Sequence, residues 1–285
     1  MSIEGKLSRF NWSVDNWGAN PSATPGTSVV PGASNVWGSI TAILSALANE
    51  AQSLNLRIMG GATTTAAKPQ VMEVYIDPAG GTSWTQLLIP AFPMGASALI
   101  TQAGSGYSFL FPIRIPVGAS VGVRIKGANA TAGTVRVSAK VYGKPSSPEN
   151  MPVGSYAEVV GTITNALGVT FTPGNAADGS WVDLGATVKD LWWWQIAYQI
   201  NNATITAEYT YIDIAFGDAS NKHVIARIMH AGTTGESCGT PMEDNMSGSW
   251  ECYQPVKAGD HIYIRGRCLN APDTGYNGAA IGVGG

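Results

Sequence analysis

The histidines and cysteines are the side chains of this sequence best suited to metal binding or nucleophilic chemistry. They are His223, His230, His261, Cys238, Cys252 and Cys268. No HExxH motif and no pair of CxxC motifs is present, and such spacings are the usual sign of a zinc site. A metal site would form only if the fold gathered these residues, so we predict no metal and no cofactor. Three cysteines are an odd number, which favours buried free thiols over a disulfide framework.

Hydrolytic chemistry finds equally little support in the sequence. No G-x-S-x-G motif is present, so a serine nucleophile on a strand-to-helix turn is not expected. Two pairs of acids, Glu208 with Asp213 and Glu243 with Asp244, have no special sequence context. Glycoside cleavage needs two carboxyl groups held a few ångströms apart, and nothing here predicts that arrangement. We therefore expect no catalytic residues and no enzymatic activity.

The composition is poor in charge for a chain of 285 residues. Charged residues make up 12% and hydrophobic residues 45%, whereas an ordinary soluble domain carries about 25% charge. Two interpretations are compatible: a β-rich protein whose exposed faces use Ser and Thr, or a surface covered by neighbouring proteins, since interface cores are depleted in charge.

The charge pattern also limits the partners. The net charge is -3 and no block of Lys or Arg stands out, so no nucleic-acid partner is expected. No run reaches the roughly 18 apolar residues of a membrane span, so no membrane partner is expected. The first residues lack the apolar core of a signal peptide, which predicts folding in a cytoplasm.

An internal repeat organises the chain. Gly118 matches Gly259 and Arg124 matches Arg265, and both pairs are 141 positions apart (259 − 118 and 265 − 124). Three further landmarks fall at the same or the adjacent offset: Pro31-Gly32 with Pro173-Gly174, Gly38-Ser39 with Gly179-Ser180, and Tyr142-Gly143 with Val283-Gly284. Matches at one nearly constant offset predict a tandem duplication.

The repeated unit is predicted to be β-structure. Residues 121–125, 135–142, 210–214 and 262–265 are rich in β-branched and aromatic residues, and 135–142 alternates strictly. Glycine, proline, asparagine and aspartate interrupt the runs at short intervals. Many short strands separated by such turns favour an all-β fold of two tandem jelly-roll-like antiparallel sandwiches.

One segment has the composition of a helix instead. Residues 40–56 are rich in Ala, Leu, Glu and Gln, which are good helix formers. Their counterpart, residues 181–196, has the pattern of a strand, a turn near 187–190 and a second strand. We give the repeat more weight, and predict a strand at 39–44, a turn at 45–52 and a strand at 53–58.

The repeat divides the chain into four parts. We predict an N-terminal arm at 1–26, sandwiches at 27–143 and 161–285, and a linker at 144–160, whose prolines keep it extended. The arm holds Phe10, Trp12 and Trp17 with little strand pattern. Such an arm is expected to be ordered by contact, against a neighbouring subunit or another protein, or alternatively by folding back on its own sandwich.

Three consecutive tryptophans form the most informative local feature. Side chains alternate along a strand, so Trp192 and Trp194 are expected to share one face while Trp193 takes the other. One face packs in the sandwich core, and the opposite face is left for a subunit contact, a sugar-stacking platform or cover by a loop. Trp181 and Tyr198 extend this patch. With Phe10, Trp12 and Trp17 of the arm, the three tryptophans are the candidate interface residues.

The stretch at 111–124, FPIRIPVGASVGVR, resembles the FPL-x-IPAG-x-RIA-x-R signature of small β-sandwich structural proteins of tailed bacteriophages. Residues 167–174 and 179–182 look like the opening of the same unit. The resemblance covers roughly 27–143 and 161–285, and the second copy departs from it at 253–258.

The resemblance implies a virion structural protein assembled in the host cytoplasm. The expected role is a tail-associated or fibre-base component that forms a symmetric homo-oligomer, with a trimer favoured. Its partners would be itself, other virion proteins and, through the aromatic face, a host surface glycan. A capsid decoration protein and a carbohydrate-binding module are the alternatives.

Overall fold

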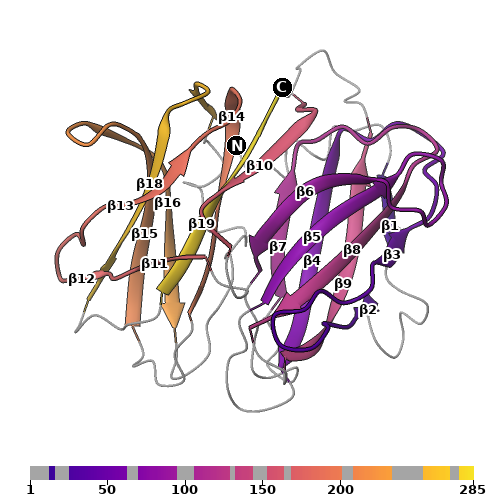
Figure 1. Cartoon of the computed structure of the whole chain (residues 1–285), viewed down its shortest axis with the longest axis horizontal. Helices are drawn as coiled ribbons and strands as arrows, with labels where there is room; N and C mark the ends of the chain where they lie inside the picture. The colour runs from indigo at the N-terminus through magenta and orange to yellow at the C-terminus, as the bar shows by residue number, and fades with distance from the viewer. Residues whose placement is uncertain are drawn as a thin grey trace.

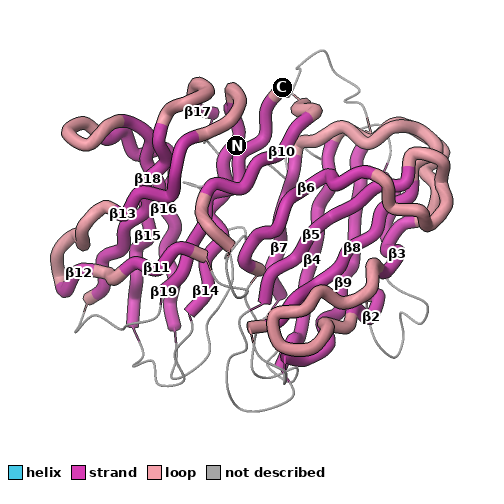
Figure 2. The backbone as a smooth tube through the Cα atoms, viewed as in Figure 1, coloured by secondary structure: helices cyan, strands magenta, loops and turns pink. Residues whose placement is uncertain are grey.

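The computed structural model describes residues 13–16, 26–62, 70–94, 106–128, 132–143, 153–163, 168–200, 208–232, 253–269 and 276–285. All of the regular secondary structure in these ranges is β-strand, as Figures 1 and 2 show. Within the same ranges, no helix has the length and apolar character needed to cross a membrane.

The described residues of the first sandwich form nine strands in two sheets. They are β1 (Ser13–Asn16), β2 (Thr27–Val29), β3 (Thr41–Leu44), β4 (Ser53–Ala62), β5 (Gln70–Asp77), β6 (Gln86–Pro93), β7 (Gly106–Phe111), β8 (Ser120–Gly127) and β9 (Ala132–Tyr142). One sheet has the order β1-β9-β4-β7, with β2 also paired to β9. The other has the order β3-β8-β5-β6.

The second sandwich repeats this plan. Its strands are β10 (Tyr156–Val160), β11 (Val169–Phe171), β12 (Gly174–Asn175), β13 (Val182–Ala186), β14 (Leu191–Ile200), β15 (Glu208–Gly217), β16 (Lys222–Gly232), β17 (Tyr253–Val256), β18 (His261–Cys268) and β19 (Tyr276–Gly284). One sheet has the order β10-β19-β14-β17, with β11 also paired to β19. The other has the order β12-β18-β15-β16, with β13 also paired to β18.

Strand for strand, the two sandwiches have the same connectivity. Strands β2 to β9 correspond to β11 and β13 to β19, and each set forms the two four-stranded sheets of an eight-stranded jelly roll. Even an irregularity is repeated: the register shifts between Ala42 and Leu44 on β3, and between Asp183 and Gly185 on β13. The predicted all-β fold of two duplicated, jelly-roll-like sandwiches is confirmed.

The helix-like segment forms strands, as the repeat predicts. β3 and β4 flank a turn in which the Leu47 N–H donates to the Ala119 carbonyl and the Ala51 N–H donates to the Ile115 carbonyl, both at 2.9 Å. These bonds replace the intrahelical bonds that local composition favours. The side chains of Leu47, Ala51 and Leu54 are buried in this arrangement.

Two predicted boundaries are corrected by the strand pairing. β10 lies inside the predicted linker 144–160, because the chain after its prolines has an apolar pattern and pairs with β19 from Tyr156 to Val160. β1 lies inside the predicted arm 1–26 and pairs with β9 from Ser13 to Asn16. This part of the arm therefore folds back on its own sandwich.

The sandwiches lie side by side (Figure 1), and they share buried apolar contacts. β6 of the first sandwich contacts β10, β14 and β19 of the second. Five residues of the second sandwich join the apolar cluster that forms the first core: Ala157, Trp193, Ala197, Ile281 and Val283. A separate cluster fills the second core. Association through buried apolar surface of this kind fixes the two sandwiches as one block.

Candidate functional site

The three consecutive tryptophans divide between the second core and the junction of the sandwiches. Trp194 is fully buried in the second core, and Trp193 is 2% exposed among residues of the first core. Trp192 is half-buried against the same cluster as Trp193. The prediction that Trp192 and Trp194 share one face of the strand is therefore wrong. The reason is that the register of β14 shifts between Leu191 and Trp193.

The face predicted to meet a partner subunit is covered within the chain itself. The Gln195 side-chain amide donates to the Leu110 carbonyl across the junction. Nearby, the Arg114 N–H donates to the Gly154 carbonyl at 2.9 Å and the Gly154 N–H to the Pro112 carbonyl at 2.8 Å. Trp193 and Trp194 thus have structural positions, as does Tyr198, which is also buried.

The aromatic residues of the arm are not placed by the structure. Phe10, Trp12 and Trp17 lie outside the described residues, as do Cys238 and Cys252. Cys268 is buried, and its thiol lies 3.2 Å from the Gly174 carbonyl. Among the described residues, no three metal-binding side chains lie together.

The repeated arginine contacts a tryptophan ring and a carboxylate in both sandwiches, although the two tryptophans are not at corresponding positions. In the first, the Arg124 guanidinium lies 4.8 Å from the centre of the Trp37 ring and its Nε is 2.6 Å from the Glu73 carboxylate. Tyr75 donates to the same carboxylate at 2.8 Å. Burial, and then the Glu73 hydrogen bond and charge, raise the pKa of Tyr75 to about 12.

In the second sandwich, the Arg265 guanidinium lies 4.3 Å from the centre of the Trp181 ring and its Nε is 3.0 Å from Asp213. Arg265 also pairs with Asp178 at 2.8 Å, and Arg227 of β16 donates to Asp213 at 2.9 Å. The hydrogen bond that Arg227 donates to Asp213 raises the pKa of Arg227. The repeated arginine therefore links two strands of its sheet and carries a tryptophan ring on its face.

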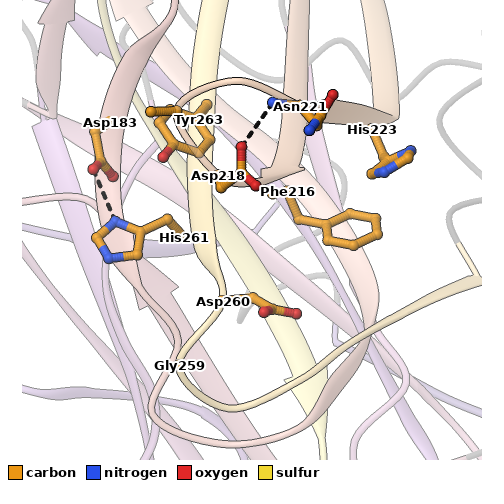
Figure 3. A pocket seen from close by; sticks show the side chains of 11 residues that line it. Asp183, Phe216, Asp218, Asn221, His223, Gly259, Asp260, His261 and Tyr263 are labelled. Carbon is orange, nitrogen blue, oxygen red and sulfur yellow. Dashed lines mark hydrogen bonds and ion pairs between the residues drawn. The ribbon is translucent and has the colours of Figure 1, made fainter.

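A cavity of about 590 Å³ opens at the end of this second sheet (Figure 3). It lies between the turn after β15, at 218–221, and the turn before β18, at 257–260. Asp218 and Asn221 line it from the first turn, and Gly259 and Asp260 line it from the second. The ends of β15 and β18 form its floor.

Aromatic and imidazole rings line the cavity from the two faces of the sheet. Phe216 and His223 are opposite each other on β15 and β16, with ring centres 5.3 Å apart. On the other side, His261 and Tyr263 lie on β18 with ring centres 6.3 Å apart. Figure 3 shows His261 and Phe216 on opposite sides, with Asp218 and Asp260 between them.

Each carboxylate of the cavity is held by a defined contact. Asp183 lies 2.8 Å from His261 Nδ1. Asp218 Oδ1 accepts from the backbone N–H groups of Ser220 and Asn221, at 2.7 and 2.8 Å, and these bonds lower the pKa of Asp218. Asp260 Oδ2 accepts from the Lys257 N–H at 3.1 Å.

The described lining of the cavity is mostly polar. Three aspartates, one asparagine and two histidines line it beside the Phe216 and Tyr263 rings. Such groups can accept hydrogen bonds from a ligand and donate hydrogen bonds to it.

Sequence reasoning identified His223 and His261 individually and did not bring them together. The side chain of His230 lies outside the described ones. One difference between the two copies could have pointed to the cavity. The turn after β5 has eight residues, 78–85, whereas the turn after β15 has four, 218–221.

No protein-family model and no curated protein matches the chain. Among solved structures, PNGF-II is 11% identical with a TM-score of 0.40, over 97% of this chain and 65% of that one. PNGase F, a glycosylasparaginase from Flavobacterium meningosepticum, is 10% identical with a TM-score of 0.35, over 96% of each chain. Infectious bursal disease virus Gx strain is 14% identical with a TM-score of 0.19, over 84% of this chain and 58% of that one. Likenesses this distant carry no argument about activity or partners.

Proposed function

We propose that this chain is a non-catalytic structural protein of a tailed-phage virion, a tail-associated or fibre-base component that assembles as a symmetric homo-oligomer. The observation that carries the proposal is the rigid pairing of two jelly rolls with the same connectivity. The motif that resembles phage structural proteins, residues 111–124, contributes the turn at Gly118 and the arginine at Arg124. Both features recur in the second sandwich.

Two sandwiches that are held in a fixed relation to each other suit a structural role in a particle. Burial of Trp193 between the sandwiches removes a large apolar side chain from water and opposes hinge motion at the junction. A pair of domains fixed in this way presents surfaces of constant spacing to its neighbours. Repeated assembly into a symmetric particle requires such constant spacing.

The surface supports subunit contacts. Large hydrophobic side chains are exposed on turns and edges of both sandwiches: Val30, Val36, Leu87, Val117, Val188, Val224 and Leu269. The low charge of the whole chain favours contacts with further copies and with other virion proteins, since interface cores are depleted in charge. A trimer is the favoured oligomer, since three tandem pairs offer six similar domains to a six-fold neighbour.

Two alternative functions remain distinct from this one. A capsid decoration protein would use the same rigid block at another position on the particle. A carbohydrate-binding module would use the cavity at the ends of β15 and β18 instead, and jelly rolls are a common lectin architecture.

Immunogold electron microscopy with antibodies against the purified chain tests the proposal on phage particles. Label on the tail or at the fibre base is expected, label on the capsid would favour the decoration protein, and unlabelled particles that lack the chain by mass spectrometry would contradict a virion role. Native mass spectrometry of the purified chain should give a trimer. A stable monomer at micromolar concentration, on and off the particle, would contradict the oligomer.

A further inference from the structure

The junction inside the chain shows how one sandwich of this fold binds another. β6 and β7 end the two sheets of the first sandwich and together form one of its sides. This side packs on the outer face of the β10-β19-β14-β17 sheet: β6 contacts β10, β14 and β19, and the Leu110 carbonyl of β7 accepts from Gln195 of β14. The covered face is apolar, with Ala197, Ile281 and Val283 buried against the first core. The junction therefore joins the side of one sandwich to a sheet face of the other.

Each sandwich has both kinds of surface, so the tandem leaves one of each unused. The unused side belongs to the second sandwich, where β16 and β17 end the two sheets. Among the described strands, β16 pairs only with β15, and β17 only with β14. The unused face is the outer face of the β1-β9-β4-β7 sheet in the first sandwich. A contact between two unlike surfaces, when it is repeated from chain to chain, produces a ring or a filament.

Strand register matches the unused face with the covered one. Ser138 of β9 corresponds to Ala279 of β19, at the offset of 141 positions that relates the two copies (279 − 138). The partner of Ser138 on β4 is Arg57, whereas the partner of Ala279 on β14 is Ala197. An arginine therefore lies on the unused face where the covered face has an alanine.

Three basic side chains share the unused face. Residues two apart on a strand point the same way, so Arg136 and Lys140 flank Ser138 on the face that also holds Arg57. Arg57 is exposed, and Arg136 and Lys140 are partly exposed. Neither Arg57 nor Arg136 forms an ion pair with any residue that the structure describes. The whole chain has only 16 Lys and Arg, and a patch of one sign attracts a partner of the opposite charge.

The unused side has the opposite charge in its sequence. Residues 233–252 join β16 to β17 and contain no Lys or Arg, but four acids: Glu236, Glu243, Asp244 and Glu251. The matching segment of the first sandwich, residues 94–105 between β6 and β7, contains no charged residue. Within the chain, an uncharged side thus meets an apolar face. The acidic side and the basic face are left for each other.

We propose that copies of this chain associate head to tail, with the β16–β17 side and acidic segment 233–252 of one copy bound to the Arg57 face of the next. The contact rests on the homo-oligomer proposed above and gives it two surfaces. Opposite charges decide which surfaces meet and steer their encounter. In a closed trimer, six sandwiches would be joined alternately by the junction inside each chain and by this contact between chains.

Analytical ultracentrifugation of the full-length protein at micromolar concentration tests the contact. The protein should be oligomeric at about 0.05 M salt and should dissociate at about 1 M, where the Debye length falls to about 3 Å. Arg57→Glu should raise the dissociation constant at least tenfold. The matched control is Lys126→Glu, which changes the charge of the first sandwich by the same amount on its other sheet, where the ammonium lies 5.0 Å from the Trp37 ring centre. The control should leave the dissociation constant unchanged.

A mixing experiment tests the head-to-tail direction. Arg57→Glu/Arg136→Glu protein keeps the acidic side, and Glu243→Lys/Asp244→Lys protein keeps the basic face. Each should be monomeric alone, and an equal mixture should form dimers that grow no further, because one pair of intact surfaces remains. Circular dichroism establishes that each variant is folded.

Three results would overturn the contact. One is a mixture without dimers, and another is a parent protein that stays monomeric at low salt, as it would if the acidic segment bound the basic face of its own copy. The third is an oligomer that neither salt nor Arg57→Glu weakens, which would leave the proposed homo-oligomer intact and refute only these surfaces. Absence of the chain from phage particles would instead count against the virion role.

Discussion

Gly118 and Gly259 occupy the same turn in the two sandwiches and make the same contact. The Gly118 N–H donates to the Leu47 carbonyl at 2.8 Å, and the Gly259 N–H donates to the Thr187 carbonyl at 2.9 Å. Both have left-handed backbones, with φ at 82° and 92°. The two glycines match in the sequence because the turn needs a left-handed backbone at this position in both copies.

Gly118→Ala and Gly259→Ala should each destabilise the protein by about 1–2 kcal/mol, the cost of a left-handed conformation for a residue with a Cβ. A Cβ meets nothing closer than 3.9 Å at Gly118 and nothing within 4 Å at Gly259. The two losses should consequently be similar in urea unfolding. Gly80→Ala should cost more, because its Cβ also collides with the Gly118 carbonyl. A neutral effect at either glycine would contradict the shared-turn explanation.

Trp193→Ala should destabilise the protein by about 3–5 kcal/mol, as expected for truncating a buried tryptophan. Because Trp193 belongs to β14 yet packs among residues of the first core, the loss should also weaken the coupling of the two sandwiches. Calorimetry should show one transition for the parent protein and two for the variant. Val188→Ala, at a side chain that is 70% exposed, is the control and should be neutral. One undisturbed transition in folded Trp193→Ala protein would show that the junction does not couple the sandwiches.

The repeat was sufficient to predict the strands near 39–44 and 53–58, because two copies of one unit are expected to adopt one fold even where their local preferences differ. It corrected the helical composition of residues 40–56, where bonds from Leu47 and Ala51 to the facing loop replace helical ones. The direction of Trp192 could not be predicted, since it depends on a register shift in β14. The cavity was missed for a related reason: it arises from a turn length and from what faces that turn, and neither follows from periodicity.

Asp213→Asn should destabilise the protein by about 2 kcal/mol, because hydrogen bonds to charged groups contribute about 1.5–3 kcal/mol. The buried carboxylate accepts from Arg227 at 2.9 Å and from Arg265 at 3.0 Å, and no amide can serve both arginines equally. Urea unfolding measures the loss. Lys257→Ala removes an exposed ion pair with Asp190 and should leave the stability nearly unchanged. If the two substitutions had equal effects, burial of the Asp213 hydrogen bonds would contribute nothing to the free energy of unfolding.

Glu158 should make the protein less stable as the pH rises. Burial raises the pKa of its carboxyl group above the ordinary value of 4.5, although the Val188 N–H lies 3.0 Å from each carboxylate oxygen. The folded state therefore holds the proton more tightly than the unfolded state does. Its contribution is fully present below pH 4.5 and is lost as the pH rises through the folded value.

Glu158→Gln should remove this dependence, because glutamine stays uncharged and keeps one oxygen to accept from Val188. Urea unfolding of both proteins across the range from pH 4 to about pH 8 measures it, and the advantage of the variant over the parent should grow with pH and then level off. The acid end serves as the internal control, since both side chains are neutral there and the two stabilities should nearly coincide. The opposite result would be a parent protein that gains stability relative to the variant as the pH rises. In that case the hydrogen bond from the Val188 N–H would outweigh the effect of burial on the Glu158 pKa, and the fold would favour the charged carboxylate.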